Sequence, residues 1–465
     1  MPQSGIMEVY MGKILKGGYI VNGTSMYKSD VRIEKEIITE IGLNLYSEND
    51  EIYDVSDKIL FPGFIDSHTH FDLEVSAGIT ADNFNTGTKA AITGGTTCIL
   101  DFATQNKGET LNVALDNWHK KAESKSSCDY GFHMAISDWN DNVKKEIDDM
   151  IREGIPSFKL YMTYDAMYLD DKKILGVLKK IKEVNGLVGV HCENKGIIDF
   201  LINCCRERDD LKPVNHYLTR PDIAEAEAVN RLIYLASVTG TKITIVHLSS
   251  KKAYEEILRA KDKGIEVYVE TCPQYLVLNN DKYINDKQQC LNYCIAPPLR
   301  DKEDSEALWN ALLKEDIQFI GTDHCSFTTE QKMQGINDFT LVPCGMPGVE
   351  LRPSLIFTYG VLQRKMTYSQ MCRLLSENVA KIYGLYPRKG CISVGSDADI
   401  VVWNPDISWI STKNNQVSVA DYNPYDGTEL YGAPDTVFLR GEVVCEKGVV
   451  KKENMGKFIP RFYKQ

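Results

Sequence analysis

The segment ILFPGFIDSHTH, residues 59–70, joins an apolar run to two histidines that stand two positions apart. Residues 59–65 predict a buried strand, and a strand points alternate side chains toward the same face. His68 and His70 therefore present two imidazoles to one side at the end of that strand, which is half of the donor set that a zinc site needs. Two exposed histidines at a strand end are the simpler alternative, and the rest of the chain decides between the two.

From residue 60 onward, short apolar segments alternate with longer amphipathic ones. Segments such as 172–184, 223–238 and 253–263 carry apolar residues at spacings of three and four, which indicates helices. Eight apolar strands separated by such helices predict a parallel (β/α)8 barrel of the TIM type, with a doubly wound open sheet as the alternative. The eight predicted strands are 59–65, 96–102, 130–136, 157–161, 187–190, 242–246, 266–271 and 317–320.

The two ends of the chain differ from the middle, because their short alternating segments lack helical periodicity. These segments are 19–21, 31–33, 37–38, 391–394, 399–403, 436–439 and 442–445. Either end alone would form a marginal sheet, whereas both together can form one small β-sandwich. We therefore expect residues 1–58 to form the N-terminal part of the sandwich, 59–389 the barrel, and 390–465 the C-terminal part of the sandwich and a tail.

Composition limits the partners and the compartment. The chain has 465 residues, 43% of them hydrophobic, and a net charge of −12 without a concentrated basic stripe, which argues against nucleic acid and anionic membranes as partners. The thirteen cysteines include no Cys-x-x-Cys pair, which indicates free thiols in a reducing compartment. Without a basic and then apolar leader or a run of eighteen apolar residues, a cytoplasmic protein is expected.

Four further residues stand where the predicted strands run or end. His191 and His247 directly follow predicted strands, Asp323 lies three residues beyond the last one, and Lys159 lies inside another. Catalytic groups of such barrels gather at the carboxyl ends of the strands. One histidine at a strand end is usually structural, but in company with the His-x-His pair these residues indicate a metal centre.

Lys159 needs a chemical explanation, because a protonated ammonium has no lone pair and cannot bind a cation. If burial and metal charge lower its pKa, the neutral amine can add carbon dioxide and form a carbamate. The carbamate is anionic and can bridge two metals that lie about 3.5–4 Å apart. A lysine that pairs with an acid is the alternative, and an unpaired lysine on a buried strand would be costly.

Longer motifs carry a specific resemblance. They are FPGFIDSHTH (61–70), SFKLYMTY (157–164), VHLS (246–249), ETCPQYL (270–276), APPLR (296–300) and GTDH (321–324). Together they resemble the dihydropyrimidinase/hydantoinase branch of the amidohydrolase superfamily, and the likeness extends to GSDAD at 395–399.

The resemblance implies a centre of two divalent metal ions, expected to be zinc. His68 and His70 would hold the first ion together with Asp323, the two isolated strand-end histidines would hold the second, and Lys159 would bridge both as N6-carboxylysine. The expected ligand set is therefore His68, His70, Lys159, His191, His247 and Asp323.

The resemblance also implies the catalytic roles. A hydroxide shared by the metals would attack the ring amide carbonyl, with Asp323 as general base and then general acid. Tyr164, five residues beyond Lys159, matches the substrate-binding tyrosine of the family and would donate to the developing oxyanion or to an imide oxygen of the substrate. His324 would support Asp323 from behind, and we assign no role to His119, His133 and His216.

Two expected substrate contacts depart from the family pattern. Ala296 stands where many hydantoinases carry Ser, and Cys344 stands where they often carry Asn. These positions bind the cyclic imide largely through backbone groups, so recognition of the –CO–NH–CO– edge is expected to survive. The pocket mouth is expected to be apolar and to suit a hydrophobic ring substituent. Its predicted lining residues are Phe71, Leu73, Met167, Tyr168 and Phe327.

The expected activity is therefore metal-dependent hydrolysis of 5-substituted hydantoins or dihydropyrimidines to N-carbamoyl amino acids. Asp72 follows the His-x-His motif where dihydroorotase-like enzymes carry Arg, which disfavours an anionic substrate. Allantoinase is the alternative activity because it shares the metal ligands. A non-catalytic assembly protein of the same fold is disfavoured because all six ligand positions are filled. The resemblance implies a homotetramer, or a dimer.

Overall fold

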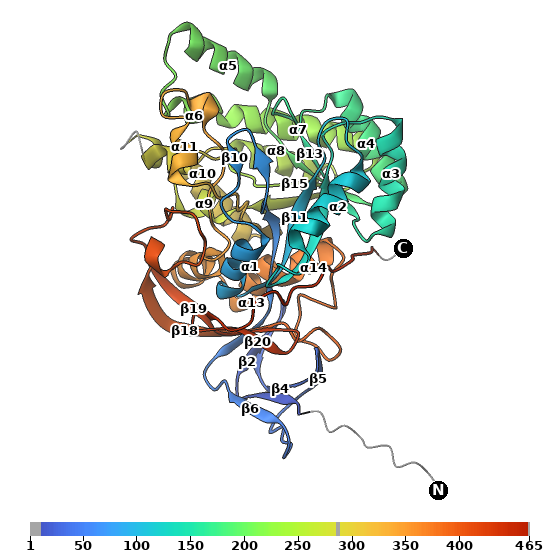
Figure 1. The fold of residues 1–465 in the computed structure, drawn as a ribbon, viewed down its shortest axis with the longest axis vertical. Helices are drawn as coiled ribbons and strands as arrows, with labels where there is room; N and C mark the ends of the chain where they lie inside the picture. The colour runs from blue at the N-terminus through green and yellow to red at the C-terminus, as the bar shows by residue number, and fades with distance from the viewer. Residues whose placement is uncertain (1–10, 285–288, 464–465) are drawn as a thin grey trace.

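The computed structural model describes residues 11–284 and 289–463, which form a helix-covered barrel next to a β-rich part (Figure 1). Strands from both chain ends, blue and red in Figure 1, lie side by side in that second part. Residues 1–10 of the expected segment 1–58 and residues 464–465 of the expected segment 390–465 lie outside the described residues. Within the described ranges, we find no helix that is both long and apolar enough to cross a membrane.

Eight parallel strands form the barrel, and strands that follow one another in the chain pair with one another. They are β8 (Phe64–Thr69), β11 (Thr96–Thr104), β12 (Asp129–Ala135), β13 (Ser157–Tyr161), β14 (Leu187–His191), β15 (Ile243–Ile245), β16 (Val267–Thr271) and β17 (Phe319–Ile320). The first and last barrel strands are β8 and β17. They are joined just after β17 ends, by a parallel bridge between Thr69 and His324. The predicted TIM-like barrel is confirmed, because a doubly wound sheet would reverse its strand order.

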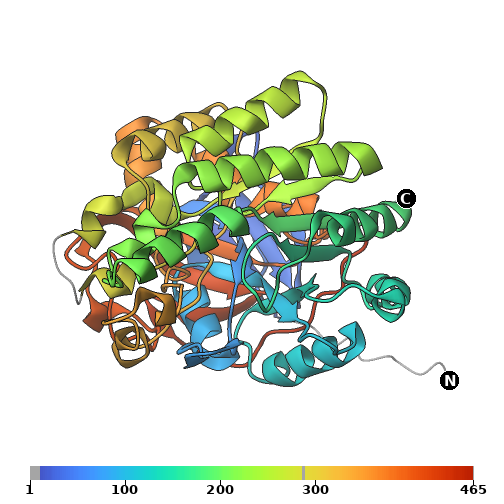
Figure 2. The same cartoon turned by 90° about the horizontal axis from the view of Figure 1, so that it is seen from above.

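Helices surround this sheet, as the view from above shows (Figure 2). In α4, for example, Ile174, Val177 and Ile181 lie on one buried face, and the Asp170 side chain caps the N-terminus by accepting the Lys173 N–H. The helices are α1 (Phe84–Thr93), α2 (Leu111–Ala122), α3 (Asp141–Arg152), α4 (Asp171–Glu183), α5 (Lys195–Glu207), α6 (Asn215–Leu218), α7 (Asp222–Thr239), α8 (Lys251–Asp262), α9 (Pro273–Val277), α10 (Lys302–Leu313), α11 (Thr329–Met333), α12 (Arg352–Ile356), α13 (Tyr368–Cys372) and α14 (Asn378–Ile382).

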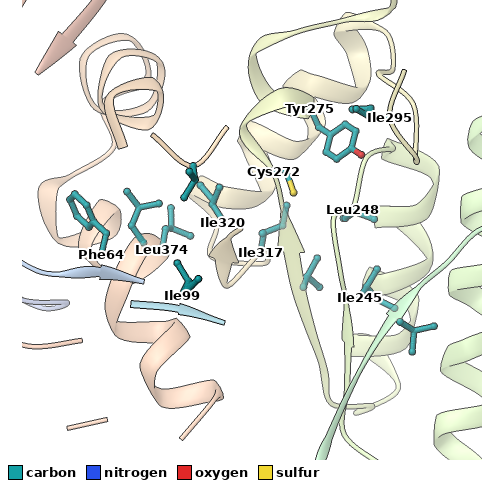
Figure 3. Packing of buried hydrophobic residues seen from close by; sticks show 14 of the residues in the cluster. Phe64, Ile99, Ile245, Leu248, Cys272, Tyr275, Ile295, Ile317, Ile320 and Leu374 are labelled. Carbon is teal, nitrogen blue, oxygen red and sulfur yellow. The ribbon is translucent and has the colours of Figure 1, made fainter. Parts of the chain in front are cut away.

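Apolar side chains from strands and helices fill a large core, beside a smaller cluster that holds Ile65, Leu100 and Phe319. Figure 3 shows Ile99, Ile245 and Ile320 of the strands in the same cluster as Leu374 and Tyr275. Close packing of this kind holds each strand end in place, because a packed core deforms little. The barrel can therefore present side chains at its strand ends in fixed positions.

The terminal segments build two sheets. A four-stranded sheet in the order β5-β4-β1-β6 packs against a seven-stranded sheet in the order β21-β20-β19-β18-β7-β2-β3, with Leu15, Val402 and Phe438 among the side chains between them. The predicted joint contribution of both chain ends is confirmed. The strands are β1 (Lys13–Lys16), β2 (Tyr19–Val21), β3 (Met26–Lys28), β4 (Asp30–Glu34), β5 (Ile37–Gly42), β6 (Glu51–Asp54), β7 (Ile59–Pro62), β18 (Ile400–Ile410), β19 (Glu429–Leu439), β20 (Glu442–Glu446) and β21 (Val449–Val450); a separate pair, β9 (Glu74–Val75) and β10 (Gly78–Ile79), follows barrel strand β8.

The prediction of one continuous strand over 59–65 is wrong. Residues 59–62 form β7, which pairs with β18 and β2 of the terminal sheet, and the chain crosses into the barrel at Gly63. The Gly63 N–H donates to the Asp399 carbonyl, and a Cβ at this position would lie 2.0 Å from Thr97 Oγ1. Because only glycine fits this crossing, we propose that the boundary between the two parts lies at Gly63.

The predicted β segment 391–394 is also wrong. These residues form a turn that leads to β18, and Val394 is 63% exposed. An alternating pattern over only four residues can arise in a turn whose polar groups find other partners. Here the Ser396 hydroxyl donates to the Pro387 carbonyl at 2.9 Å.

Candidate metal centre

Three side chains meet where β8 and β17 end. His68 lies in β8, His70 directly follows that strand, and Asp323 follows β17 with a φ of +52°. Asp323 Oδ1 lies 3.2 Å from His68 Nε2 and 3.1 Å from His70 Nε2. Their donor atoms all lie within 4.8 Å of one another, which is the separation expected of ligands that share one metal ion.

A second pair of imidazoles lies beside this group. His191 is the last residue of β14, and His247 follows β15 with a φ of +41°. His191 Nδ1 lies 3.0 Å from His247 Nε2. The ring of His247 is also 5.4 Å from the ring of His68, so the two groups form one cluster.

Lys159 projects from β13 into the middle of this cluster. Its Nζ lies 3.5 Å from His68 Nε2 and 4.8 Å from the centre of the Phe102 ring. The side chain is buried, and it has no carboxylate partner at ion-pair distance among the described residues. Burial lowers the pKa of Lys159 to about 8, although Asp323 and Glu270 act in the opposite direction. The neutral amine is therefore accessible near neutral pH.

The Asp323 carboxylate is kept ionised by its neighbours. Burial alone would raise the pKa of Asp323, but the imidazoles of His68 and His70 hold it well below its ordinary value. Asp323 is therefore an anion that can bind a cation or accept a proton.

Two buried carboxylates orient the histidines from behind. Glu270 Oε1 lies 2.6 Å from His68 Nδ1, and Glu193 Oε2 lies 2.7 Å from His191 Nε2. Each carboxylate accepts the N–H of its imidazole, which turns the lone pair of the other ring nitrogen toward the centre. Arg220 Nη1 donates to Glu193 at 2.5 Å. No motif in the sequence indicated a role for Glu270, Glu193 or Arg220, although Glu193 stands two positions after His191.

Tyr164 lies next to the second pair of histidines. Its backbone has a φ of +68°, and its ring lies 5.1 Å from the His191 ring and 5.4 Å from the Arg220 guanidinium. Burial raises the pKa of the Tyr164 phenol well above its ordinary value, so the hydroxyl stays protonated and can donate. In the described part of the chain the hydroxyl has no hydrogen-bond partner.

Two residues predicted for the pocket mouth belong to the core instead. Phe71 is fully buried and packs against Phe84 and His324, with ring centres 5.8 and 5.2 Å away. Phe327 is also buried, with the ammonium of Lys332 5.6 Å from its ring. The prediction that these two rings line an open mouth is wrong, because both side chains are enclosed by neighbouring residues of the protein interior.

The other predicted lining residues remain partly accessible. Leu73, Met167 and Tyr168 are half-buried, and the Met167 and Tyr168 N–H groups both donate to the Tyr164 carbonyl. This turn places both side chains beside Tyr164 in sequence and space.

The two predicted backbone contacts lie on segments that touch. Ala296 precedes a cis proline, and Cys344 is half-buried. The Gly345 N–H donates to the Cys294 carbonyl at 3.0 Å, which joins the segment of Ala296 to that of Cys344.

The remaining histidines have structural partners. His324 Nε2 lies 3.1 Å from Asp82 Oδ2, and its Nδ1 accepts the Gly348 and Val349 N–H groups. His133 lies between Ser157 and the Ser67 carbonyl, and His216 Nε2 contacts the Ile295 carbonyl. These contacts occupy both ring nitrogens of His133 and His324.

Comparison with known proteins agrees over almost the whole chain. Residues 59–444 match the amidohydrolase family. The chain is 41% identical over 455 residues to a D-hydantoinase of Geobacillus stearothermophilus, and the match covers 97% of each chain. It is 37% identical over 459 residues to a dihydropyrimidinase of Rattus norvegicus, covering 96% of this chain and 88% of that protein. The crystal structure of dihydropyrimidinase from Brevibacillus agri NCHU1002 matches the fold with a TM-score of 0.96 and 38% identity, covering 98% of this chain and all of the other.

Proposed function

The chain belongs to the amidohydrolase family, as a cyclic amidohydrolase of the hydantoinase and dihydropyrimidinase type, and on this premise we propose its substrates and mechanism. It hydrolyses 5-substituted hydantoins, dihydropyrimidines or both to N-carbamoyl amino acids. The observation that carries this proposal is the convergence of four histidines, Asp323 and Lys159 at the carboxyl ends of the barrel strands.

The donor set fits two divalent ions. His68, His70 and Asp323 would hold one, and the lone pairs of His191 and His247, which face each other 3.0 Å apart, would hold the other. Imidazole and carboxylate donors suit zinc. When bound, the two ions would lower the pKa of a shared water toward neutrality and polarise the substrate carbonyl.

Lys159 completes this set as N6-carboxylysine. The amine adds to carbon dioxide and loses one proton, which yields a carbamate anion with two donor oxygens. Its position between the two groups of histidines and its lowered pKa support this modification. An unmodified ammonium would instead repel both cations.

Asp323 is the proton carrier of the reaction. Its carboxylate accepts a proton from the attacking water as the new C–O bond forms, and returns it to the ring nitrogen as the C–N bond breaks. Asp323 Oδ1 lies 3.2 Å from His68 Nε2 and 3.1 Å from His70 Nε2, so the carboxylate stands inside the proposed metal site, where it can exchange a proton with the attacking water.

Tyr164 stabilises the charge that develops on the carbonyl oxygen. Its phenol stays protonated and lies beside His191. Among the described residues, the hydroxyl donates a hydrogen bond to no acceptor. A preorganised donor at this position lowers the activation barrier, because its hydrogen bond to the carbonyl oxygen becomes stronger as negative charge develops on that oxygen.

The imide edge of the ring is bound by backbone groups of Ala296 and Cys344. Binding through the backbone supports activity although Ala296 and Cys344 replace the Ser and Asn of many hydantoinases, because backbone groups do not depend on side-chain identity. The half-buried side chains of Leu73, Met167 and Tyr168 would contact an apolar substituent at the ring carbon.

A parallel assay of the zinc-loaded protein tests the proposal. Dihydrouracil, 5-phenylhydantoin, allantoin and dihydroorotate are supplied separately, and the carbamoyl products are measured by chromatography. We expect the first two to be hydrolysed best. Fastest turnover of allantoin would assign the alternative activity, and no turnover of any ring would support a non-catalytic assembly protein.

Assembly and location complete the proposal. The family resemblance supports a homotetramer or a dimer, which sedimentation analysis measures directly. No disulfide joins two cysteines within residues 11–284 and 289–463, which supports a cytoplasmic, reducing environment.

A further inference from the structure

Lys332 is a buried cation outside the metal centre. It lies in α11, is 0% exposed, and donates from Nζ to the Pro343 carbonyl at 2.7 Å and to the Cys294 carbonyl at 2.9 Å. Among the described residues no carboxylate lies within ion-pair distance of this ammonium. Its charge is therefore balanced only by carbonyl dipoles and by the face of the Phe327 ring.

This arrangement is costly for the fold. Removing an ammonium from water without an anionic partner carries a large penalty, and burial accordingly lowers the pKa of Lys332. A methionine would fill a similar volume without that penalty. We therefore expect the buried ammonium to have a role that an apolar side chain could not fill.

The ammonium joins two segments that come from different parts of the chain. The Cys294 carbonyl also accepts the Gly345 N–H, so Lys332 and Gly345 hold the same oxygen from two sides. One segment continues to Ala296 and the other contains Cys344. In the described structure the N–H groups of Ala296 and Cys344 donate to no protein acceptor, so both are available to a ligand.

The contact with Pro343 reaches Cys344 through a single peptide group. The Pro343 carbonyl and the Cys344 N–H belong to the same resonant amide. A positive charge on the carbonyl oxygen polarises that amide and makes its N–H a stronger donor, because hydrogen bonds in series strengthen one another.

We propose that Lys332 is a positioning residue for ring recognition, which fixes the Ala296 and Cys344 segments at one spacing and strengthens the Cys344 N–H as a donor to the cyclic imide. This inference rests on the proposed function. Lys332 touches neither the metal centre nor the ring, so its loss weakens ground-state binding of the ring and leaves the chemical step intact. In kinetic terms KM rises while kcat stays nearly constant.

Two substitutions separate the effect of the two hydrogen bonds to the Cys294 and Pro343 carbonyls from the effect of the positive charge. Lys332→Met removes both donors, whereas Lys332→Gln keeps an amide that can still donate to the two carbonyls but carries no charge. For Lys332→Met we expect KM for the best ring substrate to rise roughly 10- to 100-fold, with kcat changed less than about threefold. For Lys332→Gln we expect a smaller rise, because only the polarisation of the amide is lost.

Lys261→Met is the matched control. Lys261 also donates from Nζ to a backbone carbonyl, that of Asp316 at 2.9 Å, but it pairs in addition with the Asp316 carboxylate at 3.2 Å and lies in α8, away from the Ala296 and Cys344 segments. It should lower the melting temperature slightly and leave KM unchanged. Melting curves of all variants define a temperature at which each is folded, and kinetics are measured there.

The outcomes distinguish this inference from the proposed function. If the wild-type protein hydrolyses a ring substrate and the folded Lys332 variants keep its KM, the positioning role is wrong and the proposed function stands. If the wild-type protein hydrolyses none of the four rings, the proposed function fails and this inference falls with it. A raised KM for Lys332→Met, a smaller rise for Lys332→Gln and none for Lys261→Met support the inference.

Discussion

Glu270 and His68 form a buried carboxylate–imidazole pair, with Oε1 2.6 Å from Nδ1. The same carboxylate oxygen accepts the backbone N–H of His247 at 3.0 Å. One side chain therefore orients a histidine from each half of the proposed metal centre. Loss of this carboxylate should consequently affect both halves, whereas Glu193 contacts His191 but, among the described residues, no second histidine of the centre.

Glu270→Gln should weaken the binding of both metal ions, by about 10- to 100-fold, because a carboxylate behind a ligating imidazole fixes its tautomer and raises its basicity. Competition with a chelator measures both affinities. Glu225→Gln is the control, since Glu225 is equally buried but contacts Ser249 instead of a histidine. Equal affinities in the Glu270 variant and the wild type would contradict this orienting role.

Lys159→Ala should remove the bridging carbamate. We expect the intact zinc-loaded protein to carry the added mass of one carbon dioxide at Lys159, and the variant to lose this mass, bridged metal and activity. Short carboxylates such as acetate should restore part of the activity, because they can occupy the same bridging position. A wild-type protein with two bound metals and an unmodified Lys159 would refute the carbamate.

The carbamate should also form with a pH dependence set by Lys159. An ordinary lysine has a pKa of 10.5, whereas burial lowers that of Lys159 to about 8. The neutral amine reacts, so modification of the metal-depleted protein at constant dissolved carbon dioxide should accelerate up to about pH 8 and then level off. The site-specific rate is measured by mass spectrometry, and a rate that keeps rising to pH 10 would show an ordinary lysine.

Asp323→Asn should lose about 10²- to 10⁴-fold in kcat, because the amide cannot carry the proton from the attacking water to the ring nitrogen. Metal content must be measured beside the rate, since Asp323 is also a proposed ligand. A variant with full metal occupancy and near-native turnover would exclude the proton-carrier role.

The sequence predicted the barrel, and it predicted that His68, His70 and Asp323 would lie together, because both rest on local patterns. Apolar segments at regular intervals specify strands, and His191 or His247 at a strand end must face the same rim of a closed parallel barrel as His68. What the sequence could not show was set by contacts between distant segments. The change of sheet at Gly63 depends on Thr97 and Asp399, which no pattern around residue 63 reveals.

The same limit explains the errors around the site. Phe71 reads as a pocket residue from its place after the His-x-His motif, but its direction is decided by space beside Gly87, where an added Cβ would lie 2.2 Å from its ring. Glu270 and Lys332 are likewise ordinary charged residues in sequence. Only their buried contacts with His68 and with the carbonyls of Cys294 and Pro343 identify them.

Substrate preference follows from the side chains that do remain accessible. Met167 and Tyr168 follow Tyr164 in a backbone turn and are half-buried, and we propose that they contact an apolar ring substituent. Aryl hydantoins should then show a higher kcat/KM than dihydrouracil. The advantage should be graded, because apolar contacts of this size discriminate by only about 10- to 200-fold.

Met167→Ala should narrow this aryl advantage and leave hydrolysis of dihydrouracil largely unchanged, because dihydrouracil has no substituent to contact the lost side chain. Phe71→Ala serves as the contrasting variant. Since Phe71 is a core residue packed against Phe84, its truncation should destabilise the protein by about 3–5 kcal/mol without changing the ratio of the two substrates. Steady-state kinetics on an aryl hydantoin and dihydrouracil measure the substrate ratio of each variant, and thermal unfolding measures its loss of stability. A substrate ratio that shifts in Phe71→Ala but not in Met167→Ala would place the substituent against the Phe71 side of the barrel and contradict the pocket described here.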